Sequence, residues 1–145
     1  MIVVREITDP IEGLELQKKL QALLPQLNPT MQHLPEERLR EVVQSPYCHL
    51  LVAEQQGQVV GMLTLALYPT LTARRGWVED VVVDSAYRGQ GLGKELVAFA
   101  IDYVEKNLAP CSLILTSRPE RIAANKLYQK AGFEQRQTNV YKIDI

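Results

Sequence analysis

Three glycines fall within five residues of the segment Arg88-Gly89-Gln90-Gly91-Leu92-Gly93-Lys94. A near-continuously apolar run precedes it and predicts a strand over residues 77–83. After it, apolar residues recur at three- and four-residue steps and predict a long amphipathic helix over residues 91–108. Such a loop lets backbone N–H groups converge, and the helix adds its unpaired N–H groups and positive dipole end. The sequence therefore predicts a phosphate-binding site where a strand meets a helix.

Two common phosphate-binding motifs do not fit this segment. The P-loop requires Gly-Lys-Ser/Thr at its end, and that sequence is missing here. The dinucleotide fingerprint G-x-G-x-x-G needs its third glycine one position later than Gly93 and usually follows the first strand of a βαβ unit. One alternative stays open, in which the glycines only tighten a strand-to-helix turn.

The rest of the chain predicts a mixture of strands and helices. Pro10 opens a helical stretch that Pro25 and Pro29 end, and a second helix is predicted over residues 35–44. Further strands are predicted over residues 2–7, 49–54, 59–68 and 112–116. The second and third of these form a β-hairpin.

The C-terminal part predicts one more helix and one or two strands. Ser117 with Glu120 three residues later fits a capping box that opens a helix through Ala131. Gly132 is a natural stop for that helix. The clearest of the last strands is predicted over residues 140–145.

Length and charge limit the classes of fold and function. The 145 residues suffice for one well-buried core, and we expect a single domain over residues 1–145. The net charge of −1 argues against a nucleic-acid or anionic-membrane partner, because both need a basic surplus. No apolar run approaches the length of about 18 to 20 residues needed to cross a bilayer, so we expect a cytoplasmic protein. Cys48 and Cys111 form no cluster, which predicts neither a disulfide framework nor a metal site.

The glycine-rich segment resembles the coenzyme A loop of a known enzyme family. Arg88, Gly91 and Gly93 match R-x-x-G-x-G, which is similar to the pyrophosphate loop of the GNAT superfamily of N-acetyltransferases. A second landmark, Leu127-Tyr128-Gln129-Lys130-Ala131-Gly132-Phe133, resembles the family's Leu-Tyr-x-Lys-x-Gly-Phe segment at the usual distance downstream. The run over residues 77–89 looks like the glucosamine-6-phosphate N-acetyltransferase branch of that family.

The resemblance implies an α/β fold of the α+β type, the GNAT fold. Its mixed central sheet would have about six or seven strands, with about four helices on its two faces. The sheet is expected to splay near the end of the strand over residues 77–83. The cofactor and the amine would enter this splay from opposite sides.

Acetyl-CoA is the co-substrate that the resemblance implies. Backbone N–H groups of the loop would hold its pyrophosphate with help from Arg88, and the preceding strand would bind its pantetheine arm. The expected cofactor-binding residues are Val81, Val82, Val83, Arg88, Gly89, Gln90, Gly91, Leu92, Gly93, Lys94 and Asn125. Asn125 lies one turn before Tyr128, whereas many family members place an asparagine seven residues before the tyrosine, where this chain has Arg121.

Tyr128 is the candidate general acid. In the family a tyrosine at this position points at the sulfur. A phenol with a pKa near about 10 can donate its proton to a thiolate, although this transfer is not strongly downhill. The alternative is that Tyr128 fills the core beside Leu127.

Glu79 and Asp80 are the candidates for the general base. Adjacent carboxylates in an apolar strand are expensive to bury without a partner, and neighbouring strand residues are expected to point to opposite faces. Glu79 is favoured as the base, while Asp80 would bond to backbone or to a second subunit. The alternative is a structural salt bridge to Arg74 or Arg75.

These features predict an N-acetyltransferase that moves an acetyl group by direct transfer to a primary amine of a small molecule. The acceptor would be an amino-sugar phosphate, an amino acid or a similar amine. A non-catalytic acyl-CoA-binding regulatory module, a protein or peptide N-acetyltransferase, and a nucleotide-phosphate-binding domain of another type are the alternatives. No metal is expected, and the resemblance leaves a homodimer open.

Overall fold

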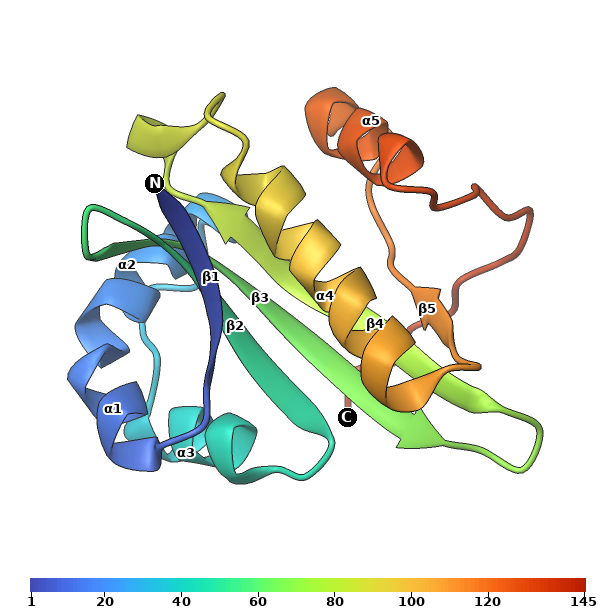
Figure 1. Cartoon of the computed structure of the whole chain (residues 1–145), viewed down its shortest axis with the longest axis horizontal. Helices are drawn as coiled ribbons and strands as arrows, with labels where there is room; N and C mark the ends of the chain where they lie inside the picture. The colour runs from blue at the N-terminus through green and yellow to red at the C-terminus, as the bar shows by residue number, and fades with distance from the viewer.

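A five-stranded mixed sheet forms the centre of the fold (Figure 1). The computed structural model describes residues 1–145. The strands are β1 (Ile2–Ile7), β2 (Cys48–Gln55), β3 (Gln58–Pro69), β4 (Arg74–Val83) and β5 (Ser112–Ile114). They lie in the order β1-β2-β3-β4-β5, with antiparallel pairing from β1 to β4 and parallel pairing between β4 and β5. β4 is therefore an inner strand, as its near-continuous apolar sequence predicted.

Five α-helices cover the two faces of this sheet. They are α1 (Pro10–Glu15), α2 (Gln17–Leu27), α3 (Glu36–Gln44), α4 (Leu92–Leu108) and α5 (Ile122–Lys130). A short 3-10 helix, η1 (Ser85–Tyr87), precedes α4. The first three helices pack on one face and α4 on the other, while α5 lies beside α4 near the β5 edge (Figure 1). None of the helices combines the length and the apolar character that a membrane crossing requires.

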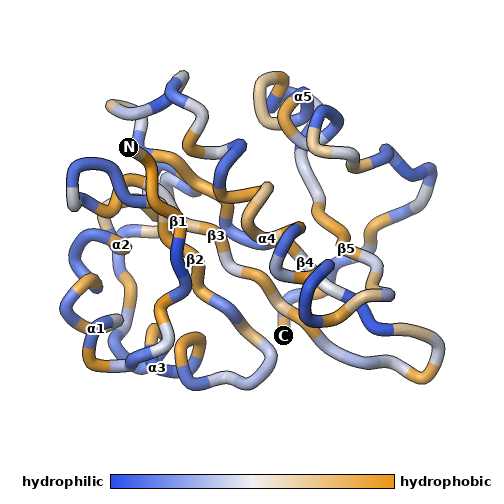
Figure 2. Tube along the Cα trace, in the orientation of Figure 1, coloured by the Kyte–Doolittle hydropathy of each residue, from blue (hydrophilic) through white to orange (hydrophobic).

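Alternating side chains of the strands build two hydrophobic cores. In β2, Leu51 and Ala53 belong to the core under α4, whereas Leu50 and Val52 belong to the core under α1, α2 and α3. This alternation follows from the pleat, which points successive side chains to opposite faces. The central strands are accordingly among the most hydrophobic parts of the chain in Figure 2. The two cores hold β4 in place between the helical layers.

The first predicted helix is two helices in the structure. They are separated at Leu16, and α2 then continues through Pro25 into its last turn, so the prediction that Pro25 ends the helix is wrong. A proline this close to the end removes only one backbone hydrogen bond, and the burial of Leu20, Leu23 and Leu24 outweighs that loss. The chain therefore has five α-helices instead of about four.

The strand predicted over residues 140–145 is wrong, and the sheet has five strands instead of six or seven. Val140, Tyr141 and Ile143 are 71%, 88% and 82% exposed, and the backbone of this segment has no hydrogen bond to another element. Alternating apolar residues form a strand only where a neighbouring ladder exists. β5 is three residues long and offers little edge to extend. The predicted hairpin, long helix and short strand are confirmed as β2 with β3, α4 and β5.

Candidate active site

The candidate site lies where β4 and β5 part. The two strands pair from Arg75 with Ser112 to Trp77 with Ile114, and β4 then continues to Val83 without a partner on this side. The predicted splay is present, but it begins directly after Trp77, earlier along β4 than the expected place near the end of residues 77–83. A cavity of about 360 Å³ lies beside the unpaired part of β4, and its polar lining consists of Asn28, Glu79, Asp80, Thr116, Arg121 and Tyr128.

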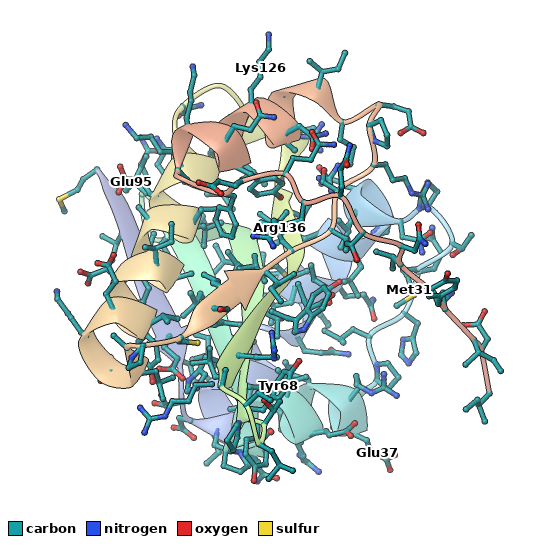
Figure 3. All side chains as sticks on the ribbon, turned by 90° about the vertical axis from the view of Figure 1, so that its right-hand side faces the viewer. Met31, Glu37, Tyr68, Glu95, Lys126 and Arg136 are labelled. Atoms are coloured by element: carbon teal, nitrogen blue, oxygen red, sulfur yellow. The ribbon has the colours of Figure 1, made fainter.

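The cavity is bounded by elements from both faces of the sheet. Figure 3 looks onto this side of the molecule, with Glu95 of α4 on the left and Met31 on the right. Met31 follows α2 and lines the cavity together with Leu24 and Leu27 of that helix. The glycine-rich loop leads into the opposite helix, α4. The gap between β4 and β5 is therefore flanked by one helical layer on each side.

A β-bulge in β4 shapes the cavity wall. Glu79 pairs with Thr64 and Val82 with Met62, so β4 has one residue more than β3 between these pairs. Asp80 lies in the bulge with φ at +50°, in the left-handed region that few non-glycine residues adopt. The bulge interrupts the alternation, and both carboxylates line the same cavity. The prediction that Glu79 and Asp80 point to opposite faces is therefore wrong.

Glu79 and Asp80 are both solvent-exposed at the cavity, and the surrounding protein desolvates their carboxylates only in part. Burial raises the pKa of Asp80, and burial together with the charge of Asp80 raises the pKa of Glu79. Neither side chain has an ion pair, so the salt bridge to Arg74 or Arg75 that the sequence left open is absent. A carboxylate whose pKa lies closer to neutral is a stronger proton acceptor. The raised pKa values of both carboxyl groups are compatible with the general-base role that the sequence predicts for Glu79.

We expect the Asp80→Asn variant to be more stable than the wild type at pH 7. The pKa of Asp80 is higher in the folded state than in the unfolded state. The protonated carboxyl group therefore favours folding, fully so below the unfolded-state pKa, and this stabilisation is lost as pH rises through the folded-state pKa. At pH 7 the wild type thus holds a carboxylate that the protein desolvates in part, and neutral asparagine removes this charge while tolerating the left-handed backbone. Urea unfolding at pH 7 and at about pH 3 measures the effect. The gain should shrink at the lower pH, and equal gains at both values would contradict this explanation.

Tyr128 connects the core to the cavity. Its side chain is only 6% exposed, and its ring meets Phe133 in an edge arrangement with centroids 6.1 Å apart. The packing role that the sequence left open is therefore present, yet Tyr128 also lines the cavity that holds both carboxylates. Burial raises the pKa of the Tyr128 phenol, and the charge of Arg121 partly opposes this rise. The phenol keeps its proton at neutral pH and can act as a donor.

The glycine-rich loop presents an open helix N-terminus. Gly91 caps α4 with φ at +85°, and no heavy atom lies within 4 Å of the position that a Cβ would take. A Cβ at Gly93 would lie 3.1 Å from Leu127, so this glycine lets α5 approach the start of α4. The first N–H groups of an α-helix lack intrahelical partners and favour an anion. The loop therefore has the form of a phosphate cradle.

The predicted cofactor-binding residues from Val81 to Lys94 follow one continuous path along the end of β4, the loop and the first turn of α4. Arg88 Nε donates a hydrogen bond to the carbonyl oxygen of Val83 at 3.1 Å. Gln55 Nε2 donates to Gln90 Oε1 at 2.8 Å. These two bonds connect the loop to the end of β4 and to the end of β2.

The start of α5 differs from the sequence prediction. Its N-cap is Arg121 without a side-chain capping bond, so the capping box of Ser117 and Glu120 is wrong. Asn125 Nδ2 instead donates to the carbonyl oxygens of Arg118 and Arg121, at 2.9 and 2.8 Å. Asn125 lies inside α5, and its side chain thus supplies donors to two carbonyl oxygens of the turn that precedes the helix. Ser117 Oγ is buried and has no hydrogen-bond partner. Asn125 thus fixes the backbone of the segment that carries Arg121.

Asn28, Met31, Thr116 and Arg121 line the cavity but were not among the predicted site residues. Arg121 could have been found, because it precedes Tyr128 by seven residues, which is about two helical turns. Asn28 and Met31 lie in a segment after α2 that carries no motif. Only the packing of α2 beside β4 brings them to the cavity.

Comparison with known proteins gives a family match over most of the chain. The model of the acetyltransferase (GNAT) family matches residues 17–133. The glucosamine 6-phosphate N-acetyltransferase of Trypanosoma brucei brucei is 30% identical over 146 residues, which covers 98% of this chain and 93% of that protein. The alignment thus spans both the glycine-rich loop and the Tyr128 segment.

Solved structures show the same arrangement of elements. A transcriptional regulator from Bacillus halodurans C-125 has a TM-score of 0.84 and 26% sequence identity, with 100% of both chains covered. An aminoglycoside N-acetyltransferase in complex with coenzyme A has a TM-score of 0.77, covering 99% of this chain and 95% of that one. At 16% identity, the second similarity is one of fold.

Proposed function

The chain belongs to the GNAT acetyltransferase family, as its sequence motifs predicted, and we propose that it acetylates the primary amine of a small molecule. Family membership makes it an acetyl-CoA-dependent acetyltransferase. The proposal for the acceptor depends on the cavity, where Glu79 and Asp80 lie without ion-pair partners beside Tyr128. Two carboxylates attract an ammonium group, and about 360 Å³ is within the usual range for small-molecule pockets.

We expect acetyl-CoA to bind along β4, the glycine-rich loop and the N-terminus of α4. The open backbone at Gly91 and the free N–H groups that follow it suit the pyrophosphate, and Arg88 adds a positive charge beside them. The pantetheine arm would lie along residues 81–83, where β4 lacks its β5 neighbour. When bound, acetyl-CoA supplies the thioester whose carbonyl carbon the amine attacks. The N–H groups at the start of α4 and the guanidinium of Arg88 are thus the kinds of donor that the pyrophosphate of acetyl-CoA needs.

Glu79 and Tyr128 would carry the proton transfers. The bound ammonium first loses one proton to solvent, and as the resulting neutral amine attacks and the C–N bond forms, Glu79 accepts the second N–H proton. As the C–S bond breaks, Tyr128 donates its phenolic proton to the departing sulfur. One proton is gained by Glu79 and one is lost by Tyr128, so exchange with solvent restores both groups. Asp80 supports the first transfer, because its charge raises the pKa of Glu79.

Several amines fit this description. The Trypanosoma brucei brucei relative is named for an amino-sugar phosphate, and the structural neighbour bound to coenzyme A is named for aminoglycosides. Both are amines of small, polar molecules, which supports a small-molecule acceptor for this chain. An amino-sugar phosphate is the first acceptor to test, since that relative aligns over nearly the whole chain.

Thiol release from acetyl-CoA, measured across a panel of amines, tests the proposal. The panel contains glucosamine 6-phosphate, amino acids, polyamines, aminoglycosides and short peptides. We expect turnover with one small-molecule class and little with peptides. Turnover with peptides alone would instead indicate a protein N-acetyltransferase, and binding of acetyl-CoA without any turnover would favour the regulatory module.

We expect Glu79→Gln to lower kcat/KM by about tenfold to 100-fold at neutral pH, because the amine loses its proton acceptor. Asp80→Asn should cause a smaller loss. Activity rises as pH rises through the pKa of Glu79, and removal of the Asp80 charge lowers that pKa. The acidic limb of the pH profile should therefore move to lower pH in Asp80→Asn. Steady-state profiles of both variants measure this, and a larger loss in Asp80→Asn would reverse the two roles.

A further inference from the structure

Arg121 lines the cavity as an exposed residue, and its side chain has no partner within the protein. Arg121 lines the cavity and caps α5, and its side chain makes neither an ion pair nor a side-chain hydrogen bond. Only its backbone is held, since its carbonyl oxygen accepts from Asn125 Nδ2 at 2.8 Å. The positive charge is therefore available to the groups that share the cavity.

Arg121 and Tyr128 lie about two turns apart along α5. Arg121 is the N-cap residue just before α5, and Tyr128 lies in α5 seven residues later. Both line the cavity at the unpaired part of β4. The positive charge of Arg121 and the Tyr128 phenol therefore share one cavity.

The charged groups around the Tyr128 phenol come from two elements. Glu79 and Asp80 share the cavity from β4, and Arg121 shares it from α5. Phe133 packs against the edge of the Tyr128 ring and carries no charge. Burial raises the pKa of Tyr128, and Arg121 lowers it. A nearby cation has this effect because it stabilises the phenolate relative to the phenol.

We propose that Arg121 is a positioning residue for the acid step, where its guanidinium stabilises the negative charge that Tyr128 acquires on giving its proton to sulfur. The inference rests on the proposed function of Tyr128 as the acid. The O–H bond of Tyr128 breaks as an S–H bond forms, and the phenolate electron pair stays on the oxygen, in the field of Arg121. Solvent then returns a proton to the phenolate. Arg121 acts through Tyr128 and needs no contact with the acceptor.

A direct titration of Tyr128 tests the charge coupling without acetyl-CoA. Tyrosines labelled with ¹³C at Cζ are followed by NMR, and the Tyr128 signal is the one that Tyr128→Phe lacks. We expect the pKa of Tyr128 to rise in Arg121→Gln and to stay near the wild-type value in Arg121→Lys, which keeps the charge. Arg118→Gln is the matched control, because it also removes one arginine charge and Arg118 does not line the cavity. This variant should leave the pKa of Tyr128 unchanged. An unchanged pKa in Arg121→Gln would overturn the proposal.

Kinetics supplies the second readout. Arg121→Gln should lower kcat by about tenfold, while the alkaline limb of its pH profile moves upward, because a less acidic phenol loses its proton at higher pH. Arg121→Lys should recover most of this loss. A change confined to the KM of the acceptor would overturn the proposal in favour of acceptor recognition. Full activity of Tyr128→Phe would reject the acid role of Tyr128 itself. If Tyr128→Phe is inactive and Arg121→Gln keeps the wild-type pH profile, only the role of Arg121 is rejected.

Discussion

Tyr128→Phe is expected to lower kcat by about 10²- to 10³-fold while the KM for acetyl-CoA stays near its wild-type value. Phenylalanine keeps the ring that packs against Phe133 and loses only the hydroxyl, which has no hydrogen-bond partner within the protein. The substitution therefore removes the proton donor and leaves the core filled. Steady-state thiol release measures both constants.

Tyr103→Phe provides the matched control for this substitution. Tyr103 is a partly buried tyrosine of α4 that packs beside His49, with ring centroids 4.9 Å apart, and it does not line the cavity. The same loss of a hydroxyl there should leave kcat unchanged. If Tyr128→Phe keeps wild-type turnover, another group donates the proton and Tyr128 serves the core alone.

Gly91→Val is expected to weaken acetyl-CoA binding by at least about 10³-fold. Valine at φ +85° is strained, and its branched side chain would fill the space beside the first N–H groups of α4. The pyrophosphate would then lose its approach to the backbone. Calorimetric titration with acetyl-CoA measures the affinity, and urea unfolding measures the cost in stability.

Gly57→Val separates backbone strain from lost binding. Gly57 lies in the β2–β3 turn with φ at +73°, and no heavy atom lies near the position of its missing Cβ, as at Gly91. Its valine variant should lose a similar free energy of unfolding, about 1 to 3 kcal/mol, yet bind acetyl-CoA normally. Unchanged affinity in Gly91→Val would reject the loop as the pyrophosphate site.

The loop and the Tyr128 segment could be predicted because their information is local. Glycine spacing determines where a backbone can turn with positive φ, and apolar periodicity shows which face of α4 is buried. These features need no knowledge of distant contacts. The strand, loop and helix from β4 to α4 were therefore predicted nearly within their observed bounds.

The cavity wall could not be predicted because it depends on pairing between distant segments. The bulge at Asp80 arises from the register of β4 against β3, and regular alternation wrongly separated Glu79 from Asp80. Met31 reaches the site only because α2 packs beside β4. The strand prediction over residues 140–145 was wrong for the same reason, because a strand depends on the neighbouring strand with which it pairs.

Only three residue pairs join β5 to β4, while β2 and β3 are joined along nearly their whole length. Local opening of β5 and α5 should therefore need less free energy than global unfolding, and their amides should exchange hydrogen with solvent sooner. A ligand that spans the gap binds only the closed arrangement and stabilises it, by about 2.7 kcal/mol at 100 times its Kd. Occupancy of the site would thus appear as slower exchange in α5, with β2 and β3 unaffected. Because β4 and β5 part at the site, ligand binding is expected to reduce the local opening of β5 and α5.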